Sequence, residues 1–364
     1  MPTTEQTVSP GSVEVGVDIG GTFTDVVCLT PDSQVRLVKI PTTKGDPSIA
    51  VLKAVRHMQE AWGIAPADIV RFAHGTTIAT NAVLERKVAK IGLITTEGFR
   101  DVLEVGRQFR NAMYDVILQP ETPGFLAPGA LRKEVPERIS GTGAVVTPLD
   151  EAALGRAVEA LVAENVEGIA VCFLFSFLNP MHERRARELI LKQHPDIRIS
   201  LSSEVDPAFR EYERTVATVF DVSIKPVVDR YLTKLESGLA AAGVVAPLQV
   251  IQSRGGLAAA AIARERPVRL FLSGPAAGVI GGCMVGRGAG IKDLITLDVG
   301  GTSSDIALIR NGRPTVRAEG KIAGYPVRVP MAGNSKMKGS QSKRDSLIYI
   351  DSYLNAAVLS FEPE

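Results

Sequence analysis

The chain has 364 residues, of which 45% are hydrophobic and 22% charged, so it is long enough for two domains with real cores. A formal net charge of +1 excludes the strongly basic surface expected of a protein that binds nucleic acid or an anionic membrane. The longest apolar run, residues 168–178, is too short to span a bilayer, and residues 1–12 have no apolar signal core. We therefore expect a cytoplasmic protein without nucleic-acid or membrane contacts.

The three cysteines, Cys28, Cys172 and Cys283, lie far apart in apolar segments. No pair has metal-ligand spacing, and an odd count argues against a disulfide framework. We expect buried, reduced thiols.

The N-terminal part is predicted to be an α/β domain. Residues 1–12 are polar and expected to be disordered, and the alternation from Val13 to Ile19 then predicts a strand. Further strands are expected at 24–29 and 35–40, followed by a helix that begins at Asp46-Pro47 and ends at Gly63. Three adjacent strands followed by alternating strands and helices indicate a mixed sheet.

The middle of the chain is less regular. Residues 106–146 are rich in Pro, Gly and Arg, which predicts a long loop or a small inserted lobe. Helix starts follow at Thr147-Pro148, Asn179-Pro180 and Asp206-Pro207, where a capping side chain precedes a proline. The helical stretch from 207 to 242 contains Pro226, which is expected to kink or break it.

One short motif occurs twice. Asp18–Asp25 reads DIGGTFTD and Asp298–Asp305 reads DVGGTSSD, and each follows an apolar strand. The second copy also continues into a strand and the hairpin dipeptide Asn311-Gly312. The repeat therefore indicates a duplicated structural unit.

A Gly-Gly turn between strands suits phosphate binding, because backbone N–H groups can approach a ligand that no Cβ obstructs. Two opposed turns could hold the phosphates of ATP, whereas either copy alone could be a tight hairpin with a structural aspartate. Asp18 and Asp298 are the candidate catalytic carboxylates and could hold Mg²⁺ directly or through water. The candidate ATP-binding residues in the two copies are Gly20, Gly21, Thr22 and Thr24, and Gly300, Gly301, Thr302 and Ser303.

Two further segments are candidates. His74, in His74–Thr77, precedes a helix that Thr76 or Thr77 could cap, and it is either a catalytic group near phosphate or amide, or a satisfied structural histidine. Ser273 and Gly274 precede Pro275 and form either a second anion site or a simple helix start. Arg107, Arg110 and Arg138 are candidate contacts for a carboxylate or phosphate.

Several motifs together resemble the hydantoinase A and 5-oxoprolinase family, within the actin, Hsp70 and sugar-kinase superfamily. They are Val17–Val26, His74–Arg86, Ile94–Asp101, Glu211–Arg214, Ser253–Leu257, Leu272–Gly278 and Leu297–Asp305. The resemblance implies an α/β fold of duplicated ribonuclease-H-like domains and an enzyme that uses ATP and Mg²⁺. It also implies ring opening of a small cyclic amide such as hydantoin, N-methylhydantoin or 5-oxoproline through phosphorylation of the amide oxygen. A hydantoinase B-type subunit is the implied partner, in a homo- or hetero-oligomer.

The resemblance also sets expected boundaries. The N-terminal hydantoinase/oxoprolinase domain is expected at 13–203, with the irregular segment at about 106–146 inserted in it, and the start of the hydantoinase A domain at 204–331. Residues 332–364 resemble nothing in the family, and the family usually carries Asn where Arg254 stands. We therefore expect about the first half of a subunit, with a second domain that is incomplete.

Two other functions fit the same residues. Superfamily relatives activate ketones of the acetone or acetophenone type for carboxylation, and the shared motifs do not separate this activity from amide hydrolysis. A non-catalytic truncated fragment that survives as a binding module is the third interpretation.

Overall fold

The computed structural model describes residues 12–43, 45–108, 116, 126–299, 303–317, 320–322, 325–332 and 335–338. Residues 1–11 of the segment expected to be disordered, and residues 339–364, lie outside this description. The chain forms two compact units, one of Met1–Gly274 with Ala318–Pro330 and one of Pro275–Arg317 with Met331–Glu364.

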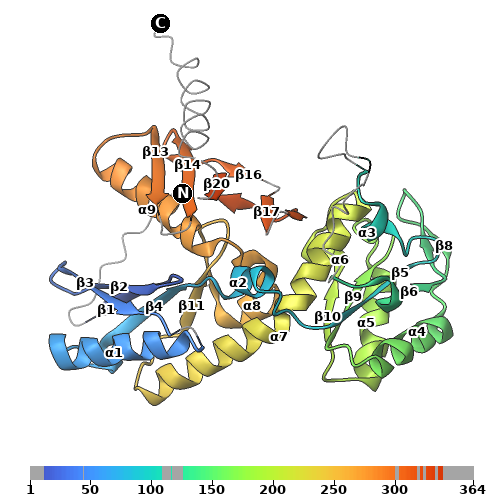
Figure 1. Cartoon of the computed structure of the whole chain (residues 1–364), viewed down its shortest axis with the longest axis horizontal. Helices are drawn as coiled ribbons and strands as arrows, with labels where there is room; N and C mark the ends of the chain where they lie inside the picture. Colours follow the sequence, from blue (N-terminus) through green and yellow to red (C-terminus); the bar gives the residue numbers. More distant parts are fainter. Residues whose placement is uncertain are drawn as a thin grey trace, which may run out of the picture. The chain divides into compact units, whose positions relative to one another are not determined.

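A six-stranded mixed sheet forms one part of the first unit (Figure 1). Its strands, in sheet order, are β12 (Leu257–Ala259), β11 (Leu248–Ile251), β4 (Ile69–Gly75), β1 (Val13–Ile19), β2 (Phe23–Leu29) and β3 (Val35–Pro41). The strands β1, β2 and β3 are antiparallel, while β4 is parallel to β1 and β11 is parallel to β4. The predicted mixed α/β class is confirmed.

The helices next to this sheet follow local sequence signals. Helix α1 (Ser48–Trp62) begins where Asp46 Oδ1 accepts a hydrogen bond from the Ser48 amide at 3.1 Å. It ends at Gly63, whose φ of 67° is the left-handed conformation that glycine adopts most easily. Helix α2 (Ile78–Leu84) follows β4 directly, as predicted.

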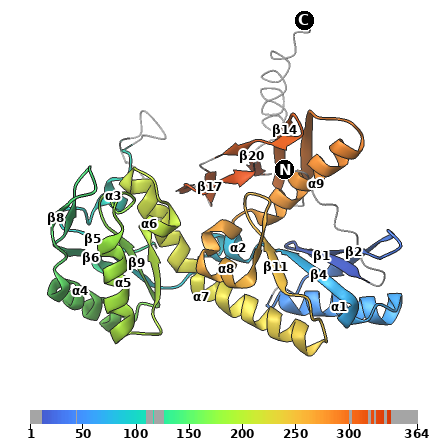
Figure 2. The same cartoon turned by 180° about the vertical axis from the view of Figure 1, so that it is seen from behind.

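A four-stranded parallel sheet forms the other part of the first unit, in the order β10 (Arg198–Leu201), β9 (Gly168–Cys172), β5 (Ile91–Thr96), β6 (Arg132–Val135). Helices α4 (Glu151–Ala163) and α5 (Met181–Gln193) cover one face (Figure 2). Strand β6 comes from the segment expected to be irregular, so part of that segment belongs to the sheet.

Shorter elements complete the first unit. They are η1 (Pro66–Asp68), α3 (Val102–Val105), η2 (Gly129–Leu131), β7 (Arg138–Ile139), β8 (Val145–Thr147), α6 (Ser202–Val205), α8 (Ala260–Glu265), η3 (Pro267–Leu270), β17 (Gly320–Ile322) and β18 (Tyr325–Val327).

Helix α7 (Glu211–Ala241) connects the two sheets of the first unit (Figure 1). It contacts β9 and β10 of the four-stranded sheet, and α1 and α2 beside the six-stranded sheet. The helix begins at Glu211, later than the predicted start at Asp206-Pro207, because Arg210 has a left-handed φ of 79°. It continues through Pro226 without a break, where a kink or interruption was expected.

The described part of the second unit is small. Helix α9 (Ser273–Gly288) leads into it, followed by β13 (Leu294–Val299), β14 (Ser303–Arg310), β15 (Arg313–Pro314), β16 (Val316–Arg317), β19 (Met331–Ala332) and β20 (Ser335–Lys338). Its core consists of Val279 and Cys283 from α9, packed against Ala307 and Ile309 from β14, with Leu294 at the edge.

Two predictions about the whole chain can be compared with these residues. All three cysteines are free and buried, as predicted. Within the described segments, no helix is long and apolar enough to cross a bilayer.

Candidate functional site

The first copy of the repeated motif is the hairpin between β1 and β2. The Gly20 amide donates to the Phe23 carbonyl at 2.9 Å, which closes the turn. The Thr42 amide donates to the Thr22 carbonyl at 2.9 Å, and Thr42 Oγ1 donates to the Gly20 carbonyl at 3.0 Å. Thr42 thus stabilises the turn by two hydrogen bonds, while Gly21 and Thr22 remain exposed.

The two glycines of this turn are needed for different reasons. A Cβ on Gly20 would lie 2.9 Å from the Phe23 carbonyl oxygen, which is closer than real Cβ contacts, so the turn itself requires glycine there. A Cβ on Gly21 would meet nothing within 4 Å. No contact within the protein therefore demands glycine at position 21, whereas the close approach of a ligand to the backbone would.

Thr24 is buried in β2, whereas we expected it to contact phosphate. Its side chain is fully buried, and its Oγ1 lies 3.0 Å from Thr42 Oγ1. Because a buried hydroxyl on the inner face of the strand cannot reach a ligand at the turn, we assign Thr24 to the support of the hairpin.

The Asp18 carboxylate is enclosed by two glycines from distant parts of the chain. Asp18 is paired in register with Gly75 at the end of β4, and a Cβ on Gly75 would lie 2.5 Å from Asp18 Oδ1. A Cβ on Gly274, in the first turn of α9, would lie 3.2 Å from the same oxygen. A Cβ at Gly75 would overlap the carboxylate, and one at Gly274 would fit only if Asp18 moved by a few tenths of an ångström. The carboxylate is therefore held in a fixed place beside the exposed turn, as a group that orients Mg²⁺ or its water ligands requires.

His74 lies one residue before Gly75 and is completely buried. Its Nε2 is 2.8 Å from the hydroxyl oxygen of Tyr231 on α7. Burial lowers the His74 pKa to about 4, so the ring is neutral at pH 7. Of the two roles that the sequence left open, the buried neutral ring, bonded through Nε2, favours a structural histidine over a proton-transferring group.

Ser273 and Thr76 join the two glycine-containing segments. Ser273 Oγ donates to the Thr76 carbonyl at 2.8 Å, and Ser273 is fully buried. Thr76 Oγ1 accepts from the Ile78 amide at 3.2 Å, whereas Thr77, at the N-cap of α2, makes no side-chain cap hydrogen bond. A helix does begin at Ser273, but the serine side chain is used for this link and not presented to an anion.

The second copy has the same backbone pattern as the first. Strands β13 and β14 pair Asp298 with Asp305, as β1 and β2 pair Asp18 with Asp25. Gly300, Gly301 and Thr302 lie outside the described residues, as do the side chains of Asp298 and Ser303. Where side chains are described, no group of three or more His, Cys, Asp or Glu residues is placed to hold a metal ion.

The arginines singled out from the irregular segment have partners within the first unit. Arg107 bonds to the buried carboxylate of Glu213, and the Arg138 guanidinium lies 5.2 Å from the ring centre of Phe99. Arg110 lies outside the described residues. These contacts give Arg107 and Arg138 structural roles.

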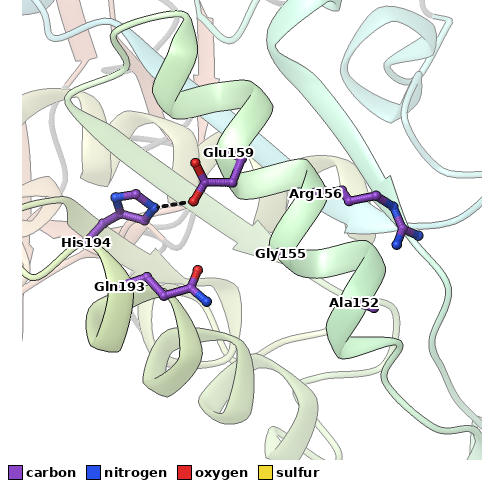
Figure 3. A pocket seen from close by; sticks show the side chains of 6 residues that line it. All are labelled: Ala152, Gly155, Arg156, Glu159, Gln193 and His194. Carbon is purple, nitrogen blue, oxygen red and sulfur yellow. Dashed lines mark hydrogen bonds and ion pairs between the residues drawn. The ribbon is translucent and has the colours of Figure 1, made fainter.

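A shallow pocket lies between α4 and α5 (Figure 3). It is lined by Ala152, Gly155, Arg156, Glu159, Gln193 and His194. The His194 ring bonds to Glu159 at 2.9 Å across it. None of the residues predicted for the site lines this pocket.

Family models match most of the chain. The model for the hydantoinase/oxoprolinase N-terminal region matches residues 14–194, and the model for hydantoinase/oxoprolinase matches residues 214–337. The chain belongs to the hydantoinase/oxoprolinase family. The second match ends at residue 337, within β20. The resemblance was expected to end at residue 331.

Named relatives of this hydantoinase/oxoprolinase-family chain include amide-cleaving enzymes. It is 35% identical to caprolactamase subunit alpha of Pseudomonas jessenii over 330 residues, which are 89% of the chain and 47% of that subunit. It is 31% identical to 5-oxoprolinase of Saccharomyces cerevisiae over 359 residues, covering 88% of the chain and 27% of that enzyme. The chain thus spans half or less of the length of these relatives.

Two solved structures of related enzymes match the fold of this chain. The crystal structure of the ATP-dependent caprolactamase from Pseudomonas jessenii matches with a TM-score of 0.82 and 34% identity, covering 89% of this chain and 48% of that one. The nucleotide-free structure of acetone carboxylase, an enzyme of ATP-dependent acetone carboxylation, matches with a TM-score of 0.79 and 27% identity, covering 90% and 48%. These matches confirm the predicted α/β fold and family.

Proposed function

We propose that this chain forms part of an ATP-dependent hydrolase that opens a cyclic amide such as hydantoin, N-methylhydantoin or 5-oxoproline. The observation that carries the proposal is the exposed Gly21-Thr22 turn beside the enclosed Asp18 carboxylate. Family membership adds support, because relatives in this family include an ATP-dependent caprolactamase and a 5-oxoprolinase.

The proposed chemistry starts from the stability of the amide. A five-membered cyclic amide is a poor electrophile, and its oxygen is its better nucleophile. When bound, ATP supplies a phosphoryl group that converts the amide oxygen into a leaving group. Water then adds to the ring carbon and the C–N bond breaks, which releases the ring nitrogen as an amine or urea group and leaves an acyl phosphate. A second water hydrolyses the acyl phosphate, so one cyclic amide, one ATP and two waters give the ring-opened acid, ADP and phosphate.

Each residue of the first copy has a proposed part in this reaction. The backbone at Gly21 and the hydroxyl of Thr22 contact phosphate oxygens, since both residues are exposed in the described part of the chain. Asp18 orients Mg²⁺ or its water ligands, which would neutralise charge during phosphoryl transfer. Thr24, His74 and Ser273 hold these groups in place from buried positions.

The second copy is proposed to bind phosphate in the same way. The support is its sequence and its register, since Asp298 is paired with Asp305 as Asp18 is with Asp25. The residues concerned are Asp298, Gly300, Gly301, Thr302 and Ser303.

A ketone carboxylase subunit is the second candidate, because the acetone carboxylase structure matches the fold almost as well as caprolactamase does. A hydantoinase B-type subunit is the proposed partner in a hetero-oligomer. This is consistent with relatives that are themselves subunits, such as caprolactamase subunit alpha and the beta subunit of acetone carboxylase.

One assay separates the candidates. ADP release is measured for the chain with a B-type subunit, over hydantoin, 5-oxoproline and caprolactam, and over acetone with bicarbonate. We expect ADP release that depends on a cyclic amide. ADP release with the ketone alone would replace the hydrolase with the carboxylase.

A binding measurement tests the third interpretation. Calorimetry of the chain with Mg-ATP should give a saturable heat of binding. Absence of both binding and turnover, with the partner subunit present, would identify a non-catalytic module.

A further inference from the structure

Tyr231 bonds to His74, which lies 157 residues earlier in the chain and next to Gly75 of the candidate site. It lies in α7, is only 7% exposed, and its hydroxyl is 2.8 Å from Nε2 of the fully buried His74. His74 stands in β4 opposite Val17 of β1, and the next pair in the same ladder is Gly75 with Asp18. The tyrosine is therefore bonded to the residue immediately before the one that encloses the Asp18 carboxylate.

Both partners of this hydrogen bond are uncharged at pH 7. Burial lowers the His74 pKa to about 4, and it raises the Tyr231 pKa above its ordinary value. At pH 7 the imidazole is thus neutral and the phenol carries its proton. A neutral imidazole has one N–H, so Nε2 either accepts from the Tyr231 hydroxyl or donates to its oxygen, according to the tautomer.

The same hydroxyl connects to the start of α2. Thr76 Oγ1 bonds to the Tyr231 hydroxyl, and it also accepts from the Ile78 amide at 3.2 Å. Ser273 Oγ donates to the Thr76 carbonyl at 2.8 Å and so ties the first turn of α9 to the same segment. The buried chain of hydrogen bonds runs from Ile78 through Thr76 and Tyr231 to His74.

We propose that Tyr231 is a positioning residue of the phosphate site, which keeps the end of β4 in the place where Gly75 encloses the Asp18 carboxylate. This inference rests on the proposed ATP-dependent function, and it adds a residue from outside the recognised motifs. Tyr231 touches neither the turn nor the carboxylate. Its effect passes through His74 and Thr76, because these residues flank Gly75.

Removing the hydroxyl has a defined local consequence. Tyr231→Phe keeps the ring and its packing but leaves Nε2 of His74 buried without its hydrogen-bond partner. Such a group gains stability by moving toward water, which loosens the end of β4. The hydrogen bonds around Gly75 and Thr76 should then open more often, and Asp18 should lose its fixed orientation.

Amide hydrogen exchange tests the positioning without any nucleotide. The Gly75–Thr77 amides are measured in the wild type, in Tyr231→Phe and in the control Tyr212→Phe, which removes a hydroxyl from the same helix at the same 7% exposure. We expect exchange to be about tenfold faster in Tyr231→Phe and within about twofold of wild type in the control. Equal exchange in both variants overturns the proposal.

Calorimetry with Mg-ATP tests the connection to the site. The Kd should rise about tenfold in Tyr231→Phe and stay unchanged in Tyr212→Phe. Faster exchange with an unchanged Kd would also overturn the proposal. If the wild type binds no Mg-ATP, the proposed function fails for this chain, while the exchange experiment still decides whether Tyr231 holds β4.

A second pair of variants keeps the test valid if Tyr231→Phe does not fold. His74→Gln retains an amide that reaches the position of Nε2 and can bond to the Tyr231 hydroxyl, whereas His74→Leu removes this polar group. Exchange at Gly75 and Thr76 should stay within about threefold of wild type in the first and rise about tenfold in the second. Equal rates in these two variants would contradict a role for this hydrogen bond.

Discussion

The two copies of the Asp-Gly-Gly-Thr motif share a backbone register but differ in what surrounds them. In the first, β1 is flanked by the parallel strand β4, and β2 is paired along its whole length with the seven-residue β3. In the second, β14 is paired at one end by the two-residue β15 and at the other by β20. One continuous neighbouring strand in the first copy thus corresponds to two short ones in the second.

This difference shows which features come from the motif itself and which come from neighbouring elements of the fold. Eight residues are enough to make a hairpin whose aspartates face each other across two strands. Fixing the carboxylate takes Gly75 and Gly274, which come from other parts of the chain. The motif therefore determines the turn, and the rest of the domain determines how firmly its aspartate is held.

The largest expected effect tests whether both copies act in catalysis. Asp18→Ala and Asp298→Ala should each lower Mg-ATP-dependent turnover by at least about a hundredfold, because each removes a charge that orients the metal ion. ADP release with the partner subunit is the measurement. A loss in Asp18→Ala alone would make the second copy structural, and unchanged turnover in both would refute the phosphate-site proposal.

Hydrogen exchange should separate the copies by stability. The amides of β1 and β2 should exchange at least about a hundredfold more slowly than those of β13 and β14. The reason is that the second hairpin packs on a core cluster of four buried residues, whereas β1 lies inside a six-stranded sheet. Mass spectrometry of peptides from both hairpins gives the rates. Similar protection would show that the second copy has support comparable to the first.

Acidic pH should lower the free energy of unfolding of the chain, because His74 beside the first copy is buried and neutral. Its pKa in the folded protein is about 4, below the value of about 6.5 in an unfolded chain, so the unfolded state binds the proton first as pH falls. The stability from the neutral ring is complete above pH 6.5 and is lost as pH falls toward 4. Wild type should lose about 2 kcal/mol more than His74→Asn between pH 7.5 and 5 in urea unfolding. Parallel pH profiles would contradict the neutral buried ring.

The smallest expected effect distinguishes the two glycines of the first turn. Gly21→Ala should leave the unfolding midpoint unchanged but raise the Kd for Mg-ATP about tenfold, because the new methyl group meets only the ligand. Gly20→Ala should lower the midpoint, since its Cβ would press on the Phe23 carbonyl. An unchanged Kd in Gly21→Ala would place the nucleotide elsewhere.

Local patterns in the sequence predicted much of the fold. The alternation of Val13, Val15, Val17 and Ile19 predicted β1, and a helix, α2, follows His74–Thr77 as predicted. Strand β6 was missed because Arg132–Val135 is mostly polar and shows no alternation. The continuity of α7 through Pro226 was missed because packing against the four-stranded sheet and against α1 and α2 outweighs the local cost of the proline.

The site was predicted less completely than the fold. The turn and Asp18 follow from the motif, but the burial of Thr24 depends on Thr42 in a neighbouring strand. Tyr231 lies in the middle of a helix, far along the chain from His74, and nothing near it in the sequence marks it. Contacts of this kind arise only when distant elements fold together.

Helix α7 makes buried polar contacts with both sheets of the first unit. Arg214 near its start donates to the Phe173 carbonyl at 2.8 Å, just beyond β9, while Tyr231 bonds to His74 in β4. At 1.5 Å per residue these two side chains are about 25 Å apart along the axis. A tilt of about 5° at one end would move the other by about 2 Å, a shift comparable to those that act in allosteric proteins. The helix thus links the carboxyl end of β9 to that of β4 through two buried polar contacts, one near its start and one in its middle.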